Sequence, residues 1–232
     1  MSEPPVRAAE QRQRWRLVVA RAAGAPEQAQ RDLADDWLAA IDAAGLPVAW
    51  TEGARPRPRI AFGAPLPIGL AANGELIDIV TTERWPAWRV REALDRHVPA
   101  GWRLVDVHDV WLAGPPLAGR VAAADYAIVL AAGPRGDLIR VAAAGLLAAQ
   151  QLPRERARGD GTVAYDLRPL LLAISVEDGP PVSITARTRF HPELGTGRPE
   201  EVVAALSDRL GLPIEIGSVV RDRLVLVEDL DA

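Results

Sequence analysis

Arginine side chains recur at every second position in two short stretches of this 232-residue chain. The first stretch holds Arg55, Arg57 and Arg59, which are separated by Pro56 and Pro58. Proline fixes φ, lacks a backbone donor and pushes the residue before it towards extended geometry. Alternate side chains of an extended segment point the same way, so we expect three guanidinium groups on one side of a stiff ribbon. Such a ribbon would bind phosphate or carboxylate groups bidentately. We call residues 50–59 the arginine hinge.

A second group of candidate anion-binding residues consists of Arg154, Arg156, Arg158 and Arg168. The chain carries a net charge of −4, so a groove in which both groups met would bind one polyanion selectively and in a salt-sensitive manner. Two structural alternatives stay open. The hinge could be an edge strand that proline and charge protect from aggregation. The second group could be the solvent face of a strand.

Two carboxylates, Asp32 and Asp166, are the candidates for acid–base chemistry. Asp32 lies near the start of a helix expected over residues 30–44, where a carboxylate also suits the helix dipole. Asp166 precedes Arg168 by two positions, and these two residues could instead form a buried ion pair that orders a hairpin. Neither carboxylate has a diagnostic catalytic partner in the sequence.

Composition excludes several classes of site. The chain has no cysteine, which rules out disulfides, thiolate nucleophiles and cysteine-ligated zinc or iron–sulfur centres. Its three histidines, at positions 97, 108 and 191, lack metal-ligand spacing, and no phosphate-binding loop or nucleophile elbow is present. We therefore expect no metal and no cofactor. No apolar run reaches the length of a membrane span, and residues 1–12 lack a signal-peptide core, so we expect a cytoplasmic protein.

Hydrophobic periodicity predicts an α+β fold made of two ferredoxin-like (split βαβ) halves, with antiparallel sheets and helices on one face. Strands are expected at 14–23, 59–63, 75–82 and 102–112, and helices at 30–44 and 85–97. After a Gly/Pro-rich linker at 114–120, strands are expected at 121–131, 152–161, 162–176, 182–190 and 213–227, and helices at 136–151 and 199–210. The predicted organisation is a disordered tail (1–13), a first domain (14–113), the linker and a second domain (121–232).

Several motifs together resemble a known family. In the first half these are Gly-Leu-Pro at 45–47, the hinge with Glu52-Gly53 and Pro58-Arg59, Pro-Leu-Pro-Ile-Gly at 65–69, and Glu75. In the second half they are Asp-Leu-Arg-Pro at 166–169 and Arg-Pro-Glu-Glu at 198–201. The chain resembles, from about Arg14 to Arg223, the radical-SAM-linked conserved hypothetical family, a domain of unknown function. The family's Ser-His-Leu-Asp-type segment reads Gln-Arg-Asp-Leu here, at 30–33, and Arg55 and Arg57 stand where it typically has Asn and His.

Members of that family are fused to, or encoded beside, radical SAM proteins, so the resemblance implies a radical SAM protein as partner. It leads to the hypothesis of a substrate-recognition module without catalysis of its own that binds RNA or another anion through its arginines. One alternative is an RNA-processing or RNA-modifying enzyme in which Asp32 or Asp166 is the acid or base. The other is a protein–protein scaffold. Lacking cysteine, this chain cannot itself ligate a radical SAM cluster.

Overall fold

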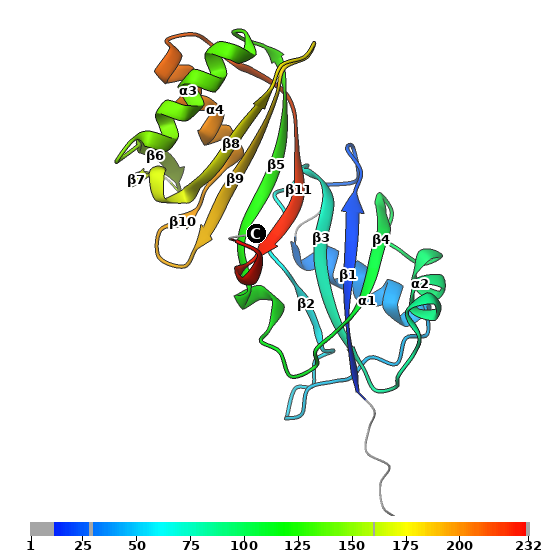
Figure 1. Ribbon diagram of the computed structural model, residues 1–232. Coiled ribbons are helices and arrows are strands. Elements are labelled where there is room, and N and C mark those ends of the chain that lie inside the picture. Colours follow the sequence, from blue (N-terminus) through cyan, green and yellow to red (C-terminus); the bar gives the residue numbers. More distant parts are fainter. Residues whose placement is uncertain (1–11, 28–29, 160, 231–232) are drawn as a thin grey trace, which may run out of the picture. The chain divides into compact units, whose positions relative to one another are not determined.

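The computed structural model of the protein describes residues 12–27, 30–159 and 161–230 (Figure 1). It is a mixed α+β structure with a large, mostly antiparallel sheet, which confirms the expected class. Positions 1–11 of the expected tail lie outside the described residues, while Gln13, the last residue of that expectation, already belongs to a strand.

The chain divides into two compact units. The first unit comprises residues 1–69 and 75–118, and the second comprises residues 70–74 and 119–232. One strand therefore contributes to both units, because its first residues belong to the second unit and its remainder belongs to the first.

The first unit contains four strands and two helices of the described chain. They are β1 (Gln13–Arg21), α1 (Gln30–Ala43), β2 (Ile60–Phe62), β3 (Ala71–Thr81), α2 (Ala87–Asp95) and β4 (Trp102–Val110). The strands lie in the order β4-β1-β3-β2, and β4 runs antiparallel to β1 as β2 does to β3. A short 3-10 helix, η1 (Leu117–Gly119), ends the unit and leads into the next.

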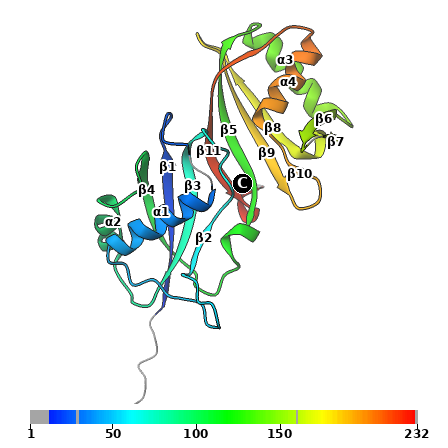
Figure 2. The same cartoon turned by 180° about the vertical axis from the view of Figure 1, so that it is seen from behind.

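The core of the first unit lies between its sheet and helix α1, which covers one face of β1 and β3 (Figure 2). Strand β1 supplies Trp15, Leu17 and Val19 at alternate positions, as a strand with one face on a core requires. Helix α1 supplies Trp37, whose ring meets Trp102 of β4 edge to face, with centroids 5.8 Å apart. Aromatic pairs favour this geometry, so the contact fixes the helix on the sheet.

The second unit is built from the remaining elements. They are β5 (Val121–Ala132), α3 (Gly136–Ala148), β6 (Pro153–Arg158), β7 (Gly161–Asp166), η2 (Arg168–Leu170), β8 (Leu171–Glu177), β9 (Ser183–His191), β10 (Gly195–Thr196), α4 (Pro199–Leu210), β11 (Glu215–Leu226) and η3 (Val227–Asp229). In its sheet β9 lies between β5 and β10 and also pairs with β8, while β11 pairs with β5. Strands β6 and β7 form a separate two-stranded hairpin.

Helices α3 and α4 pack against each other and lie on the same side of this sheet (Figures 1 and 2). Side chains from the helices and from β5 and β9 close a core between them. Examples are Ile128, Ile139, Ile184 and Leu206, each with no exposed surface. Among the described residues, no helix is long and apolar enough to cross a membrane.

Candidate functional site

The arginine hinge is an ordered, hydrogen-bonded loop of the first unit. Thr51 and Arg57 are joined by two hydrogen bonds, in which the Thr51 N–H donates to the Arg57 carbonyl (2.8 Å) and the Arg57 N–H donates to the Thr51 hydroxyl (2.9 Å). The Arg59 N–H donates to the Ala49 carbonyl at 2.8 Å, and Pro58 lies opposite Trp50. Pro58 occupies a position where the ladder needs no donor, so proline fits there.

Alternation along this ladder places Arg57 and Arg59 on one face, with Trp50, 57% exposed, on the other. Arg55 lies in a bend at the tip, so the expected extended ribbon of three arginines is wrong at that residue. All three arginines are exposed. None of their side chains has a hydrogen bond or an ion pair with any residue in the described ranges.

The arginines of β6 are, by contrast, already paired. Arg154 forms an ion pair with Asp208 at 2.5 Å, and Arg156 forms one with Glu201 at 3.0 Å. Both carboxylates lie on α4, seven positions apart, which is two helical turns and hence one helix face. These two arginines therefore join the hairpin to α4. The side chain of Arg158, the third residue of this group, lies outside the described part of the structure.

Arg156 also stacks on an aromatic ring. Its guanidinium carbon is 4.0 Å from the centre of the Tyr165 ring, a cation–π contact across the β6–β7 hairpin. Burial raises the pKa of the Tyr165 phenol, and Glu201 raises it further, because a nearby negative charge disfavours phenolate. Tyr165 therefore stays neutral at physiological pH.

The Asp-Leu-Arg-Pro motif orders the turn between β7 and β8. One carboxylate oxygen of Asp166 accepts hydrogen bonds from the backbone N–H groups of Leu152 (2.7 Å) and Arg168 (2.9 Å). The Arg168 side chain donates to the backbone carbonyls of Ala149 (3.2 Å) and Leu171 (2.7 Å). The structure thus shows no Asp166–Arg168 ion pair, and each side chain instead satisfies backbone groups.

Asp32 lies in the first turn of α1, with 59% of its side chain exposed. Arg31 approaches it at 3.9 Å, and that side chain is 89% exposed. A solvated helix start of this kind is common, because carboxylates complement the positive end of the helix. The sequence-predicted residues fall into two sets: the hinge arginines and Asp32 lie in the first unit, and the β6 arginines, Asp166 and Arg168 lie in the second.

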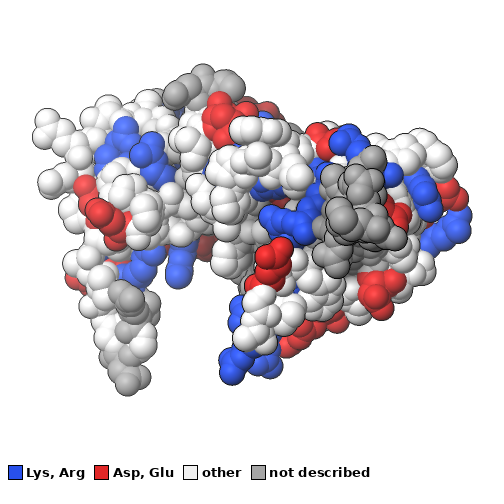
Figure 3. All heavy atoms as spheres, turned by 90° about the horizontal axis from the view of Figure 1, so that it is seen from below, with Lys and Arg blue, Asp and Glu red and all other residues white. Residues whose placement is uncertain are grey.

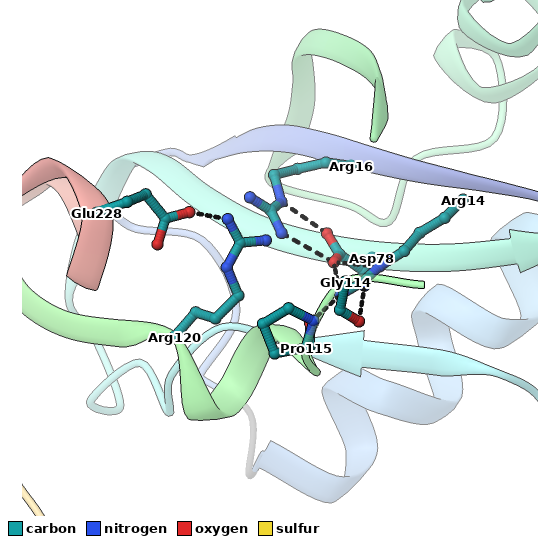
Figure 4. Close-up of polar contacts among 7 residues, drawn as sticks. All are labelled: Arg14, Arg16, Asp78, Gly114, Pro115, Arg120 and Glu228. Atoms are coloured by element: carbon teal, nitrogen blue, oxygen red, sulfur yellow. Dashed lines mark hydrogen bonds and ion pairs between the residues drawn. The ribbon is translucent and has the colours of Figure 1, made fainter. Parts of the chain in front are cut away.

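A buried ion cluster in the first unit was not predicted. Asp78 of β3 accepts from Arg14 Nε at 2.9 Å and from Arg16 Nε at 2.8 Å, and all three residues are buried (Figure 4). Arg14 also donates to the carbonyls of Gly114 and Pro115. The signal in the sequence is an aspartate flanked by isoleucines inside an apolar strand, since a buried charge needs a partner.

The second unit has a comparable cluster on its sheet. Asp125 of β5 accepts hydrogen bonds from Arg187 Nε of β9 at 2.7 Å and from Arg223 Nε of β11 at 2.8 Å. Burial by itself would raise the pKa of the Asp125 carboxyl, but the hydrogen bonds and positive charges of the two arginines outweigh it and lower the pKa. In the same unit Arg120 pairs with Glu228 (Figure 4).

Charges of both signs mix on the surface. On the face shown in Figure 3, arginines and carboxylates lie interspersed in small groups. No group of three or more His, Asp or Glu side chains suited to a metal ion occurs among the residues that the structure describes. The unpaired hinge arginines are therefore the sequence-predicted residues best placed to meet an external ligand.

Comparison with known proteins identifies the family. A model described as "Uncharacterized protein conserved in bacteria (DUF2344)" matches residues 16–210. The chain belongs to the DUF2344 family. No curated protein matches it. Among solved structures, this DUF2344 protein is similar to the crystal structure of an unknown protein from Galdieria sulphuraria, with 14% identity and a TM-score of 0.29 over 89% of this chain and 98% of that one.

Proposed function

We propose that this DUF2344 protein is a substrate-recognition module, without catalysis of its own, that binds RNA through the arginine hinge. The observation that carries the proposal is that Arg55, Arg57 and Arg59 are exposed on an ordered loop and have no partner within the described chain. An unpaired guanidinium group can donate bidentately to phosphate without first giving up an ion pair.

The order of the loop strengthens the proposal. The hydrogen bonds between Thr51 and Arg57 and between Ala49 and Arg59 hold the backbone before any ligand arrives. Binding to a loop that is already ordered costs less conformational entropy than binding to a mobile segment. Because Trp50 lies on the opposite face of the ladder, recognition rests on charge, and binding should be strongly salt-dependent.

The partner in this proposal is a radical SAM protein, and this choice of partner rests on the family resemblance described above.

We also infer that both units are ferredoxin-like. Supporting this, each unit has the order strand–helix–strand–strand–helix–strand once the β6–β7 hairpin and the two-residue strand β10 of the second unit are set aside. The strands lie in the orders β4-β1-β3-β2 and β11-β5-β9-β8. In the second unit the β6–β7 hairpin would be an insertion. A cytoplasmic location completes the proposal.

A salt titration tests RNA binding directly. A labelled single-stranded RNA is titrated with the wild-type protein and with Arg55→Ala/Arg57→Ala/Arg59→Ala, and anisotropy is followed at several salt concentrations. We expect the triple variant to bind at least ~10-fold more weakly, and the slope of log K against log salt to fall by about 2, since each phosphate contact on a single strand contributes about 0.7.

The matched control replaces three exposed arginines elsewhere in the same unit, Arg31→Ala/Arg84→Ala/Arg96→Ala, which changes net charge equally. We expect it to keep most of the wild-type slope. The proposal fails if the control loses as much affinity as the hinge variant, or if neither the wild type nor the variants bind.

A further inference from the structure

The second unit contains an open pocket that the proposed function does not use. It has a volume of about 630 Å³, within the roughly 300–1,000 Å³ typical of small-molecule sites. Its walls come from the β6–β7 hairpin, from the turn between β9 and β10, and from Arg198 at the start of α4. Two separate stretches of the chain, 156–166 and 192–198, thus meet at one hollow, and two of the resemblance motifs, at 166–169 and at 198–201, contribute residues to it.

The base of the pocket is fixed by mutual contacts. Arg156 lies over the ring of Tyr165 and donates through Nη2 to Glu201 (3.0 Å) and to the Thr196 carbonyl (3.2 Å). Asp166 also lines the pocket, but one of its oxygens already accepts two backbone hydrogen bonds. The base is therefore held in place by hydrogen bonds and stacking before a ligand binds.

The rim carries one charge of each sign. Glu193 and Arg198 both line the pocket, and both are exposed. Neither side chain forms an ion pair within the described part of the chain, so they do not neutralise each other. Between them Leu194 is 48% exposed, and Val163 on the opposite hairpin is 40% exposed. The pocket thus combines an unpaired anion, an unpaired cation and apolar walls.

We propose that this pocket binds a small zwitterion of the amino-acid type with an apolar side chain. The ligand carboxylate pairs with Arg198, its ammonium group pairs with Glu193, and its side chain packs on Leu194 and Val163 above the Tyr165–Arg156 base. A ligand with only one charge would leave the other rim charge unmatched. The site is separate from the arginine hinge and stands independently of RNA binding.

Three probes that share one apolar group separate the contributions of the two charges. They are L-phenylalanine, phenylpropanoate, which lacks the ammonium group, and phenethylamine, which lacks the carboxylate. Each is titrated at millimolar concentrations into labelled protein, and the backbone amide of Gly195, which lines the pocket, reports binding by NMR. We expect L-phenylalanine to shift this amide and to bind about fivefold more tightly than either analogue, the effect of one partly exposed ion pair.

Two variants test whether Arg198 pairs with the carboxylate of the ligand and Glu193 with its ammonium group. Arg198→Gln should reduce the affinity for L-phenylalanine to that for phenethylamine, and Glu193→Gln should reduce it to that for phenylpropanoate. Arg209→Gln is the control, because Arg209 is an exposed arginine of α4, the helix that Arg198 precedes, and it does not line the pocket. The proposal is overturned if no probe shifts Gly195, if phenylpropanoate binds as tightly as L-phenylalanine, or if Arg198→Gln binds like the control.

Discussion

Arg16 donates two hydrogen bonds to the carboxylate of Asp78, from Nε at 2.8 Å and from Nη2 at 3.0 Å. Arg14 reaches the same carboxylate, so two positive charges share one buried negative charge. Such a cluster holds strand β1 on strand β3 in one register, because shifting the strand by one residue would turn both arginines to the other face.

Removing the shared carboxylate should be costly. We expect Asp78→Asn to lower the free energy of unfolding by about 3–5 kcal/mol, because two buried guanidinium groups lose their counter-charge. Denaturant unfolding of the purified protein measures this. Asp95→Asn, at an exposed position of α2, is the control and should stay within about 0.5 kcal/mol of the wild type. Equal effects of the two substitutions would show that the cluster does not stabilise the fold.

Asp125 should make stability depend on pH in the acid range. Its pKa in the folded protein lies below the ordinary value of 3.8, so the unfolded chain binds the proton more readily. The stabilisation from Asp125 is therefore fully present above the ordinary pKa and is lost as pH falls through the folded pKa.

Asp125→Asn should thus be less stable than the wild type by about 2–3 kcal/mol near neutral pH, less than for a fully buried cluster because Arg223 is 58% exposed. The difference should shrink as pH drops below about 4. Urea unfolding of both proteins across this pH range provides the measurement. A difference that stays constant down to the lowest pH at which both proteins fold would contradict the assignment.

Substitution of Gly45 should lower the stability of the protein because of its backbone conformation alone. Its φ is +66° just after α1, and a Cβ added there would meet nothing within 4 Å. We expect Gly45→Ala to destabilise the protein by about 1 kcal/mol, the usual cost of left-handed backbone for a residue with a Cβ. Gly119→Ala is the matched control, because it has the same open space without a positive φ and should be near neutral. Thermal unfolding compares them, and an equally tolerated Gly45→Ala would refute the argument.

Much of the fold could be read from local sequence signals. The first helix was expected over residues 30–44, and α1 does begin at Gln30 and end at Ala43. The second helix was expected over residues 85–97, and α2 begins directly after Pro86. The alternation over residues 102–112 predicted β4, where Trp102 and Leu104 are buried. These features depend on neighbouring residues and on period-two or helical spacing, which a single sequence displays.

Predictions from local sequence were wrong at positions whose structure depends on contacts with segments far away in the chain. No strand was expected between residues 63 and 75, where proline and glycine are frequent, yet β3 already begins at Ala71. Glycine is required at position 74 of the strand, because a Cβ there would approach the Asp222 carbonyl oxygen to 2.9 Å. Trp88 is a large apolar residue in the helix expected at 85–97 but is 65% exposed, because α2 buries Val90 and Leu94 on its other side.

The same limit applies to the candidate site. The alternation of Arg154 and Arg156 was visible in the sequence, but their partners on α4 lie 45 or more positions away and could not be inferred from it. The ion clusters of Asp78 and Asp125 were not predicted for the same reason, since each aspartate accepts hydrogen bonds from arginines of strands that are distant in the sequence.

Strand β3 constrains how this gene can be divided. Its residues Ala71 and Ala72 lie beside Val220 and Arg221 of β11, although the rest of the strand belongs with β1 and β2. A fragment starting at residue 119 would leave part of β11 without its neighbour, and a fragment ending at 118 would carry that neighbour away. Recombination that exchanged either part as a cassette would therefore break a hydrogen-bonded ladder, so the two parts are expected to be inherited together.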